Sequence, residues 1–330
     1  MAIYHCHSKP ISRSTGRSAV AACAYRTKTR LLDERQGLTH DYTRRSGVEH
    51  TEIVLPEGAD SARWTRERLW NVAEASESRK DARTAREWEI ALPDELSPAA
   101  RQKLAVDFAR ELVARYGCAV DVAVHAPSKE GDERNHHAHL LATTRMVGEK
   151  HFGEKVAIEL SDKKRLSLGL GQGRQEIEDV RALWAEKANR ALTEQGIDQR
   201  IDHRSLAAQK EEAERKGDIQ RAEQLDRAPE IKLGWKATAM ERRDIATERG
   251  EQLRAIAREN TRRVVLRLQL KEWAKRVAQS VSRKVDSFQG RYQQWKQQQE
   301  IAAQKRQQEL EKQLSPQRKI KRDRGPGWGR

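Results

Sequence analysis

Alternating apolar and polar positions divide the first two thirds of the chain into short strands and amphipathic helices. Segments with the period of a strand are 2–6, 49–55, 88–92, 119–125 and 136–144. Segments with the period of a helix are 17–29, 61–76, 98–116 and 175–195. Elements that alternate in this way and end in a hairpin predict an α+β domain, with a mainly antiparallel sheet flanked by helices.

The helix expected at residues 17–29 is unusually rich in small side chains. Ser12 or Ser14 is its expected N-cap. Alanines and a cysteine fill most of its positions between 19 and 24, so its backbone can lie very close to another element. Tyr25 is the one large polar side chain on this helix.

The last two strands carry histidines at positions that bring three imidazoles together. His137 and His139 are two residues apart, so they project from the same face of a strand. Gly131 lies midway between His125 and His137, and a turn over residues 128–133 centred on it pairs residues whose numbers add to 262. This register sets His125 opposite His137, with all three side chains on one sheet face.

Near the C-terminal end the apolar positions follow one helical period. They recur over 29 residues in eight steps, at Leu266, Leu270, Trp273, Val277, Val281, Val285, Phe288, Tyr292 and Trp295. The period is about 3.6, whereas a strict coiled coil stays nearer 3.5. Packing against the protein itself, a partner helix or a second copy is therefore open. We expect the Gln-rich residues 293–317 and the terminal residues 319–330 to be disordered or to fold on binding.

The basic charge of the chain is concentrated in this tail. With 330 residues, 36% hydrophobic and 35% charged, the chain can form one ordinary globular domain but is too polar to be compact throughout. The net charge of +15 divides into +3 for residues 1–210, −1 for 211–260 and +13 for 261–330. We expect a folded domain, a charged linker or helix, and a basic amphipathic helix with a disordered tail over these three ranges. The tail predicts binding to a polyanion, most often nucleic acid, and a solvated charged helix is the alternative.

Cysteine usage and hydropathy indicate a soluble cytoplasmic protein. The three cysteines, Cys6, Cys23 and Cys118, are odd in number and lack the CxxC spacing, which argues against a disulfide framework and a thiolate zinc site. No apolar run approaches the roughly 20 residues that span a bilayer, and the first residues lack the apolar core of a signal peptide. We therefore expect no membrane insertion.

Three neutral imidazoles on one face are a ligand set for a divalent metal. They suit Mn, Zn, Ni or Co and are poorer ligands for Mg. Three protein ligands leave coordination positions open, as at a catalytic ion, and such an ion can polarise a phosphoryl oxygen. The alternative is a histidine-rich strand that holds no ion. His136 should point to the opposite face and be structural.

Either water or a side chain could attack a phosphate at such a site, and Tyr25 is the candidate side chain. Four cations lie near it in the sequence: Arg17, Arg26, Lys28 and Arg30. They favour both a phenolate and a bound phosphate, which matters because an ordinary tyrosine has a pKa of about 10. Tyr42 is the rival nucleophile, and a core or interface role for Tyr25 remains open.

Two carboxylates could support this chemistry. Glu87 and Glu89 flank Trp88 and point to the same face of a strand. One of them could accept the tyrosine proton or hold a ligand imidazole by a hydrogen bond. Ordinary exposure at a strand edge is the alternative.

Several motifs, in order along the chain, resemble those of one family. They are Met1 to His5, Ile11 to Ala22, Ala24-Tyr25-Arg26, His40-Asp41-Tyr42, Glu87 to Pro93 and Asn135 to Arg145. Together they resemble the MobA/MobL (MobQ-type) conjugative relaxases over residues 1 to about 210. The resemblance implies an HUH endonuclease with a palm-like sheet, which nicks one strand of a plasmid transfer origin through a tyrosine and stays joined to the DNA 5′ end. One departure is His136, where the pattern commonly has proline.

Carried over by position, the resemblance implies Tyr25 as nucleophile and His125, His137 and His139 as ligands of a divalent cation, usually Mg or Mn. It also implies single-stranded or extruded DNA as the substrate, held by basic and aromatic side chains. Our candidates for DNA binding are Arg17, Arg44 and Arg45. A relaxosome accessory protein and a type IV coupling protein are expected partners, and the protein could travel to the recipient cell with the DNA.

Two other functions are consistent with the same residues. An HUH replication initiator or transposase would use the same chemistry, although those proteins usually place the tyrosine after the histidine pair. A non-catalytic DNA-binding mobilisation factor would keep the fold and the basic tail. Formation of a covalent protein–DNA adduct separates the last alternative from the others.

Overall fold

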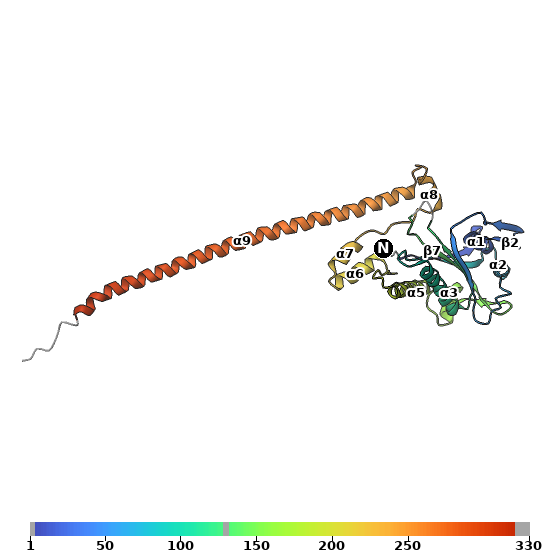
Figure 1. Cartoon of the computed structure of the whole chain (residues 1–330), viewed down its shortest axis with the longest axis horizontal. Helices are drawn as coiled ribbons and strands as arrows, with labels where there is room; N and C mark the ends of the chain where they lie inside the picture. Colours follow the sequence, from blue (N-terminus) through green and yellow to red (C-terminus); the bar gives the residue numbers. More distant parts are fainter. Residues whose placement is uncertain (1–3, 128–131, 321–330) are drawn as a thin grey trace, which may run out of the picture. The chain divides into compact units, whose positions relative to one another are not determined.

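A computed structural model describes residues 4–127 and 132–320 and divides the chain into two compact units (Figure 1). Unit 1 comprises residues 1–205 and unit 2 residues 206–330. The strands, all in unit 1, are β1 (Cys6–Ser12), β2 (Arg30–Asp33), β3 (Leu38–Asp41), β4 (Val48–Val54), β5 (Arg83–Ala91), β6 (Val120–His125), β7 (His137–Thr143), β8 (Arg145–Val147) and β9 (Phe152–Lys155). The α-helices of unit 1 are α1 (Ala19–Thr27), α2 (Arg66–Ala75), α3 (Pro98–Tyr116), α4 (Asp162–Ser167) and α5 (Gly173–Glu194).

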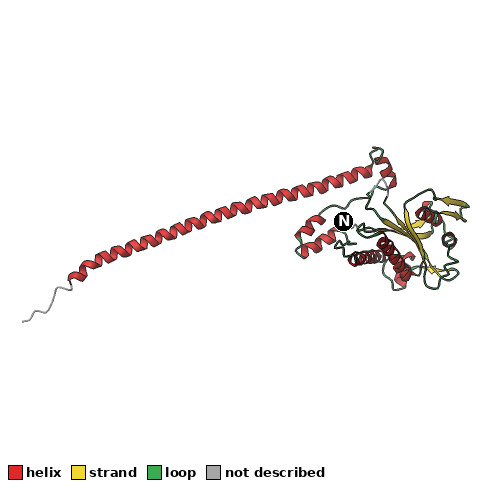
Figure 2. Cartoon of the chain, viewed as in Figure 1, coloured by secondary structure: helices red, strands yellow, loops and turns green. Residues whose placement is uncertain are grey.

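Unit 1 is built on a five-stranded antiparallel sheet in the order β1-β5-β7-β6-β4, with helices on both faces (Figure 2). One face packs against α3 and α5 through a cluster that includes Trp88, Leu140 and Phe108. Within it the rings of Phe108 and Trp184 lie 5.0 Å apart between centroids. The α+β class and the mainly antiparallel sheet are as predicted.

The other face packs against α1 and α2. Its apolar cluster includes Leu141 from β7, Val20 from α1 and Trp70 from α2. The buried alanines of α1 let the helix lie close to the sheet, as its composition predicted. Because side chains two residues apart share a face, His137 and His139 lie on the same side of β7 as Leu141. These two histidines therefore lie on the face of the sheet that is covered by α1, the helix that carries Tyr25.

The N-terminal expectations need correction. Part of the strand expected at residues 2–6 lies outside the described residues, and the strand that the structure describes begins at Cys6 and continues to Ser12. It contains Pro10, which weakens a strand pattern in the sequence but is tolerated because β1 is an edge strand. Ser12 caps a short 3₁₀ helix at Arg13–Thr15, and Ser18 is the residue that caps α1, through a bond from the backbone N–H of Ala21.

Two small hairpins were not expected at all. β2 pairs with β3, and β8 pairs with β9, in sheets of two strands each. No strand in either hairpin exceeds four residues, too few to establish a period in the sequence.

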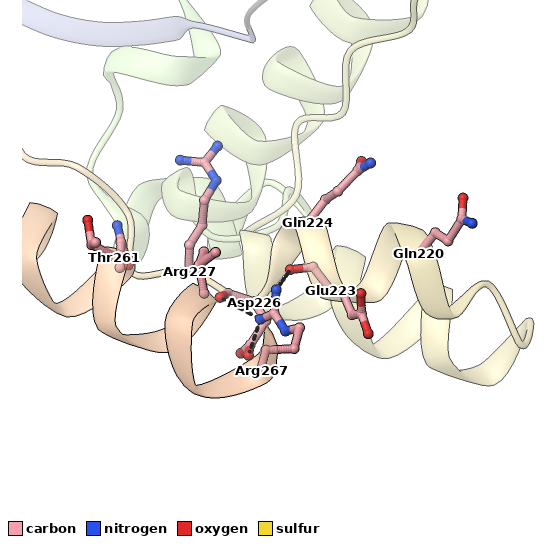
Figure 3. Close-up of a pocket in the computed structure, with 9 residues that line it drawn as sticks. Gln220, Glu223, Gln224, Asp226, Arg227, Thr261 and Arg267 are labelled. Carbon is pink, nitrogen blue, oxygen red and sulfur yellow. Dashed lines mark hydrogen bonds and ion pairs between the residues drawn. The ribbon is translucent and has the colours of Figure 1, made fainter. Parts of the chain in front are cut away.

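Unit 2 begins with a helical hairpin of α6 (Leu206–Arg215) and α7 (Ile219–Leu225), followed by α8 (Trp235–Glu241) and α9 (Glu248–Ile320). Polar contacts join α7 to α9 around a pocket (Figure 3). Arg267 donates to the carbonyl oxygen of Glu223 at 2.7 Å and to the carboxylate of Asp226 at 2.8 Å, and Lys271 pairs with Glu223 at 2.6 Å. These contacts belong to the packing of unit 2.

The helix α9 is longer than the sequence predicted. It includes residues 293–317, which we expected to be disordered or to fold on binding. Gln, Lys, Glu and Ala dominate this stretch and are good helix formers, so the correction has a local cause. The apolar stripe is uncovered: Trp273 is 60% exposed, Phe288 64% and Trp295 55%. No helix in the described part of the chain combines the length and apolarity needed to span a membrane.

Candidate metal centre and nucleophile

The three predicted histidines converge on one point. β6 and β7 pair in the predicted register, with His125 opposite His137 and Ala123 opposite His139. One ligand atom from each imidazole lies within 4.8 Å of the others, and the ring centroids are 4.9 to 5.3 Å apart. The turn that we expected to centre on Gly131 lies partly outside the described residues, but the pairing on either side confirms the register.

Each imidazole is oriented by a different element. His125 donates from Nε2 to the backbone carbonyl of Arg26 at 2.7 Å, and His137 donates from Nδ1 to the carbonyl of Asn135 at 2.9 Å. His139 contacts the Glu87 carboxylate through Nδ1 at 2.7 Å. A carbonyl or carboxylate oxygen can only accept, so a neutral ring has its lone pair on the other nitrogen. The lone pairs are then on Nδ1 of His125 and on Nε2 of His137 and His139.

The surroundings favour neutral imidazoles, which is the form that binds a metal. Burial, with a smaller contribution from the neighbouring His139, lowers the pKa of His125 to about 3. Burial also lowers the pKa of His137. Both rings are therefore uncharged at neutral pH.

Glu87 and Glu89 differ sharply in their environments. Glu87 is fully buried and contacts Arg26, His139 and Lys9, the last at 3.0 Å. Burial alone would raise the pKa of Glu87, but the bonds from His139 and Arg26 outweigh it and hold the carboxyl ionised. Glu89 lies opposite His139 in the register of β5 and β7, and its side chain is partly exposed. Its carboxylate is 3.4 Å from Nζ of Lys9.

Tyr25 lies on the last turn of α1 and is 43% exposed. Its ring lies perpendicular to the ring of Tyr42, and the two ring centroids are 5.3 Å apart. Two cations stand over it: Nζ of Lys28 lies 4.1 Å and the guanidinium carbon of Arg45 5.1 Å from the ring centroid. An exposed phenol among cations is suited to attack a phosphate.

Two other tyrosines of unit 1, Tyr42 and Tyr4, are less suited to attack. Tyr42 is half-buried and packs against the apolar cluster beneath α1. Tyr4 packs with the cluster on the opposite sheet face and donates its hydroxyl proton to the carbonyl of Arg181 at 3.2 Å. Burial raises the pKa of Tyr4 well above its ordinary value.

Arg26 joins α1, the helix that carries Tyr25, to the three histidines, a role that we did not assign from the sequence. Its carbonyl accepts from His125, and its guanidinium holds both carboxylate oxygens of Glu87. In the sequence, only its position directly after Tyr25 indicated that Arg26 lies near the site. These contacts place the end of α1 beside the three histidines.

A buried carboxylate anchors the same helix from the other side, and this residue also escaped the sequence analysis. Asp121 on β6 accepts two bonds from Arg66, at 2.8 and 2.9 Å, and one from the indole N–H of Trp70 at 3.1 Å. Its carboxylate also accepts from the thiol of Cys23 on α1 at 3.2 Å. Asp121 thus ties α1 and α2 to the sheet.

Of the three arginines predicted to bind DNA, only Arg45 contacts Tyr25. Arg45 stacks on Tyr25 and Tyr42, whereas Arg17 precedes α1 and Arg44 follows β3. All three are exposed. His136 lies away from the triad, with Nε2 3.4 Å from the carboxylate of Asp94.

The MobA/MobL family profile matches residues 17–243. The chain belongs to this family. Over 239 residues it is 42% identical to the mobilization protein MobL of Acidithiobacillus ferridurans, an alignment that covers 65% of this chain and 61% of that protein. It is also 34% identical over 297 residues to the conjugal transfer protein TraA of Rhizobium radiobacter, covering 80% of this chain and 25% of that protein. The chain therefore spans less than two thirds of the length of these relatives.

A solved structure described as "Molecular Basis of Vancomycin Resistance Transfer in Staphylococcus aureus" is similar to this MobA/MobL protein. The TM-score is 0.52 at 30% sequence identity, and the match covers 62% of this chain and all of that one. The likeness agrees with the architecture seen in unit 1.

Proposed function

We propose that this MobA/MobL protein is a plasmid mobilisation relaxase, which nicks one strand of a transfer origin and reseals it. The convergence of three imidazoles beside the helix that carries Tyr25 supports the proposal most directly. The relatives named as mobilization and conjugal transfer proteins support the biological setting.

The residues present fit a divalent cation. His125, His137 and His139 would hold it, and Glu87 orients His139 from behind. A bound cation would neutralise charge that develops on the scissile phosphate. Mg or Mn is the expected native ion, and the nitrogen ligands would also accept Zn, Ni or Co.

Tyr25 is the proposed nucleophile. Its phenolic oxygen forms a bond to phosphorus while the bond from phosphorus to the 3′ oxygen breaks. The phenol proton passes to solvent or to Glu89, and the departing 3′ oxygen takes up a proton to become a hydroxyl. The 5′-phosphotyrosyl bond keeps the energy of the broken phosphodiester, so the reverse attack reseals the strand.

The DNA must be single-stranded or extruded from the duplex to reach Tyr25. Arg45 is best placed to meet its backbone, and Arg17 and Arg44 would extend the basic surface. The exposed cations of α9 would add sequence-independent affinity. An accessory protein and a type IV coupling protein are the proposed protein partners. We expect the protein to act in the bacterial cytoplasm and to accompany the DNA into the recipient.

A labelled single-stranded oligonucleotide that contains the cognate nick site tests the proposal. With Mn²⁺ or Mg²⁺, the full chain should form a covalent adduct that survives denaturing electrophoresis, and a chelator should prevent it. Tyr25→Phe should abolish the adduct, while Tyr42→Phe, the matched control, should keep it. An undiminished adduct in Tyr25→Phe would transfer the role to Tyr42. Tight oligonucleotide binding without any adduct would favour a non-catalytic mobilisation factor.

A further inference from the structure

Lys28 has an unusual backbone conformation next to the nucleophile. It is the C-cap of α1, with φ 55° and ψ 42°, and its N–H bonds to the carbonyl of Ala24. This left-handed cap is normally taken by glycine, because a Cβ atom is crowded there. Among the described residues, Lys28 and Asp244 are the non-glycine residues with positive φ.

The side chain of Lys28 is held in an unfavourable environment as well. Burial lowers the pKa of its ammonium group, and the positive charges of Arg45 and Arg26 lower it further. The residue thus opposes folding through its backbone and through its charge. Strain of both kinds at a functional site points to a role other than stability.

The position of the ammonium indicates that role. It lies 4.1 Å from the centroid of the Tyr25 ring, closer than the guanidinium of Arg45. A cation over an aromatic face is attracted to it, and the attraction is stronger when the ring bears a phenolate. A glycine at position 28 would suit the backbone better but would remove this charge.

We propose that Lys28 is a positioning residue for Tyr25: its ammonium group, over the face of the ring, limits rotation of the ring and so holds the phenol oxygen in the orientation from which it attacks the phosphate. This inference rests on the proposed function, because it takes Tyr25 as the nucleophile. Lys28 acts through Tyr25 and need not touch the DNA.

Three substitutions in the full chain separate charge from backbone. Lys28→Gly removes the charge and suits the left-handed cap, Lys28→Asn removes the charge in a residue that tolerates this cap, and Lys28→Arg restores the charge. For each variant, single-turnover adduct formation is measured from pH 6 to 10 on the nick-site oligonucleotide. Melting temperature and affinity for a non-cleavable oligonucleotide are measured alongside.

We expect Lys28→Gly to leave the melting temperature unchanged or to raise it by about 2 °C. Its adduct rate should fall about 10- to 100-fold, because the ring of Tyr25 is no longer held in place. Lys28→Asn should show the same rate loss, and Lys28→Arg should recover the rate to within about threefold. Asp244→Gly, the matched backbone control, should leave the rate and its pH profile unchanged.

Other results would overturn the inference. A wild-type rate and pH profile in Lys28→Gly would leave Lys28 without influence on Tyr25. A lower melting temperature in that variant would make Lys28 a structural cap, and a parallel loss of oligonucleotide affinity would make it a DNA contact. The proposed function is judged separately: it fails if Tyr25→Phe keeps the adduct, whereas the Lys28 inference alone fails if Tyr25→Phe loses the adduct and Lys28→Gly does not.

Discussion

Charged side chains are arranged differently in the two units. In unit 1 several are buried and paired, such as Glu87 with Arg26 and Asp121 with Arg66. In α9 most of the basic residues are exposed, along a helix whose apolar stripe is exposed too. The buried pairs of unit 1 hold helices and strands around the three histidines, while the cations of α9 face outward over most of its length.

The difference shows that net charge alone does not locate the chemistry. The three histidines and Tyr25 lie in a region whose net charge is small, because its acidic residues nearly match its basic residues in number. The tail holds most of the excess charge but, in its described part, no cluster of metal-ligating side chains. Four predictions address the histidines, the buried charges of unit 1 and the cations of α9 separately.

The largest effect should come from removing two histidines. The double variant His137→Ala/His139→Ala leaves one imidazole, so we expect Mn²⁺ binding to disappear and the adduct rate to fall at least about 1,000-fold. Isothermal titration and gel-based adduct formation measure the two losses. His136→Ala is the neighbouring control and should retain both. Persistent adduct in the double variant would contradict the metal site.

The next effect is on the stability of unit 1. Asp121→Asn leaves the Arg66 guanidinium without its charged partner, and we expect a loss of about 3 to 5 kcal/mol in the free energy of unfolding. Urea titration followed by tryptophan fluorescence measures this loss. The exposed pair of Arg79 and Asp81 supplies the control, since Asp81→Asn should change stability by no more than about 0.5 kcal/mol. Equal effects of the two substitutions would remove the contrast between buried and exposed charge.

A third prediction addresses the charge of α9. Changing Arg283, Lys284, Arg291 and Lys296 to Gln keeps good helix formers but removes four cations. If these contact DNA phosphates, affinity at low salt should fall about 100-fold and the salt dependence should lose a slope of about 3. Anisotropy titrations with a nonspecific oligonucleotide at several salt concentrations measure both. Glu272→Gln with Asp286→Asn should not weaken binding. An unchanged slope in the first variant would favour a protein partner for α9.

The smallest expected effect is on the pH dependence of the stability of unit 1. Burial raises the pKa of Glu176, but bonds from Arg115, Tyr116 and Arg165 outweigh it and leave the pKa below its ordinary value. The unfolded chain then binds a proton more readily, so the stabilisation is complete above the unfolded pKa of about 4.3 and is lost as the pH falls through the folded value. Glu176→Gln should lower stability by about 1 kcal/mol at pH 7 and by less at pH 3. Glu186→Gln, at an exposed pair with Arg190, should show neither effect. A loss that is the same at both pH values would contradict the assignment.

The histidine triad was predictable because its geometry is local. His125 and His137 are joined by a short hairpin, so strand periodicity and one turn fix their register. The neighbours of Tyr25 were not predictable in this way. Tyr42 and Arg45 reach it through the β2–β3 hairpin, whose strands are too short to show a period.

Residues that act across long sequence separations were also missed. Arg26 and Glu87 are 61 residues apart, and their contact depends on the packing of α1 on the sheet. Asp121 interrupts an otherwise apolar strand, where an acid suggests a solvent-facing position. Only tertiary structure shows that Arg66, Trp70 and Cys23 enclose it.

The two anchors of α1 also have a mechanical meaning. In the proposed covalent intermediate, tension on the DNA strand would pull on Tyr25 and so on the end of α1. Cys23 links this helix to Asp121 on β6, and Arg26 links it to Glu87 on β5. Both strands lie inside the sheet rather than at its edges. The force would therefore be shared between two interior β-strands. The helix could then hold a DNA strand under tension without detaching from the sheet.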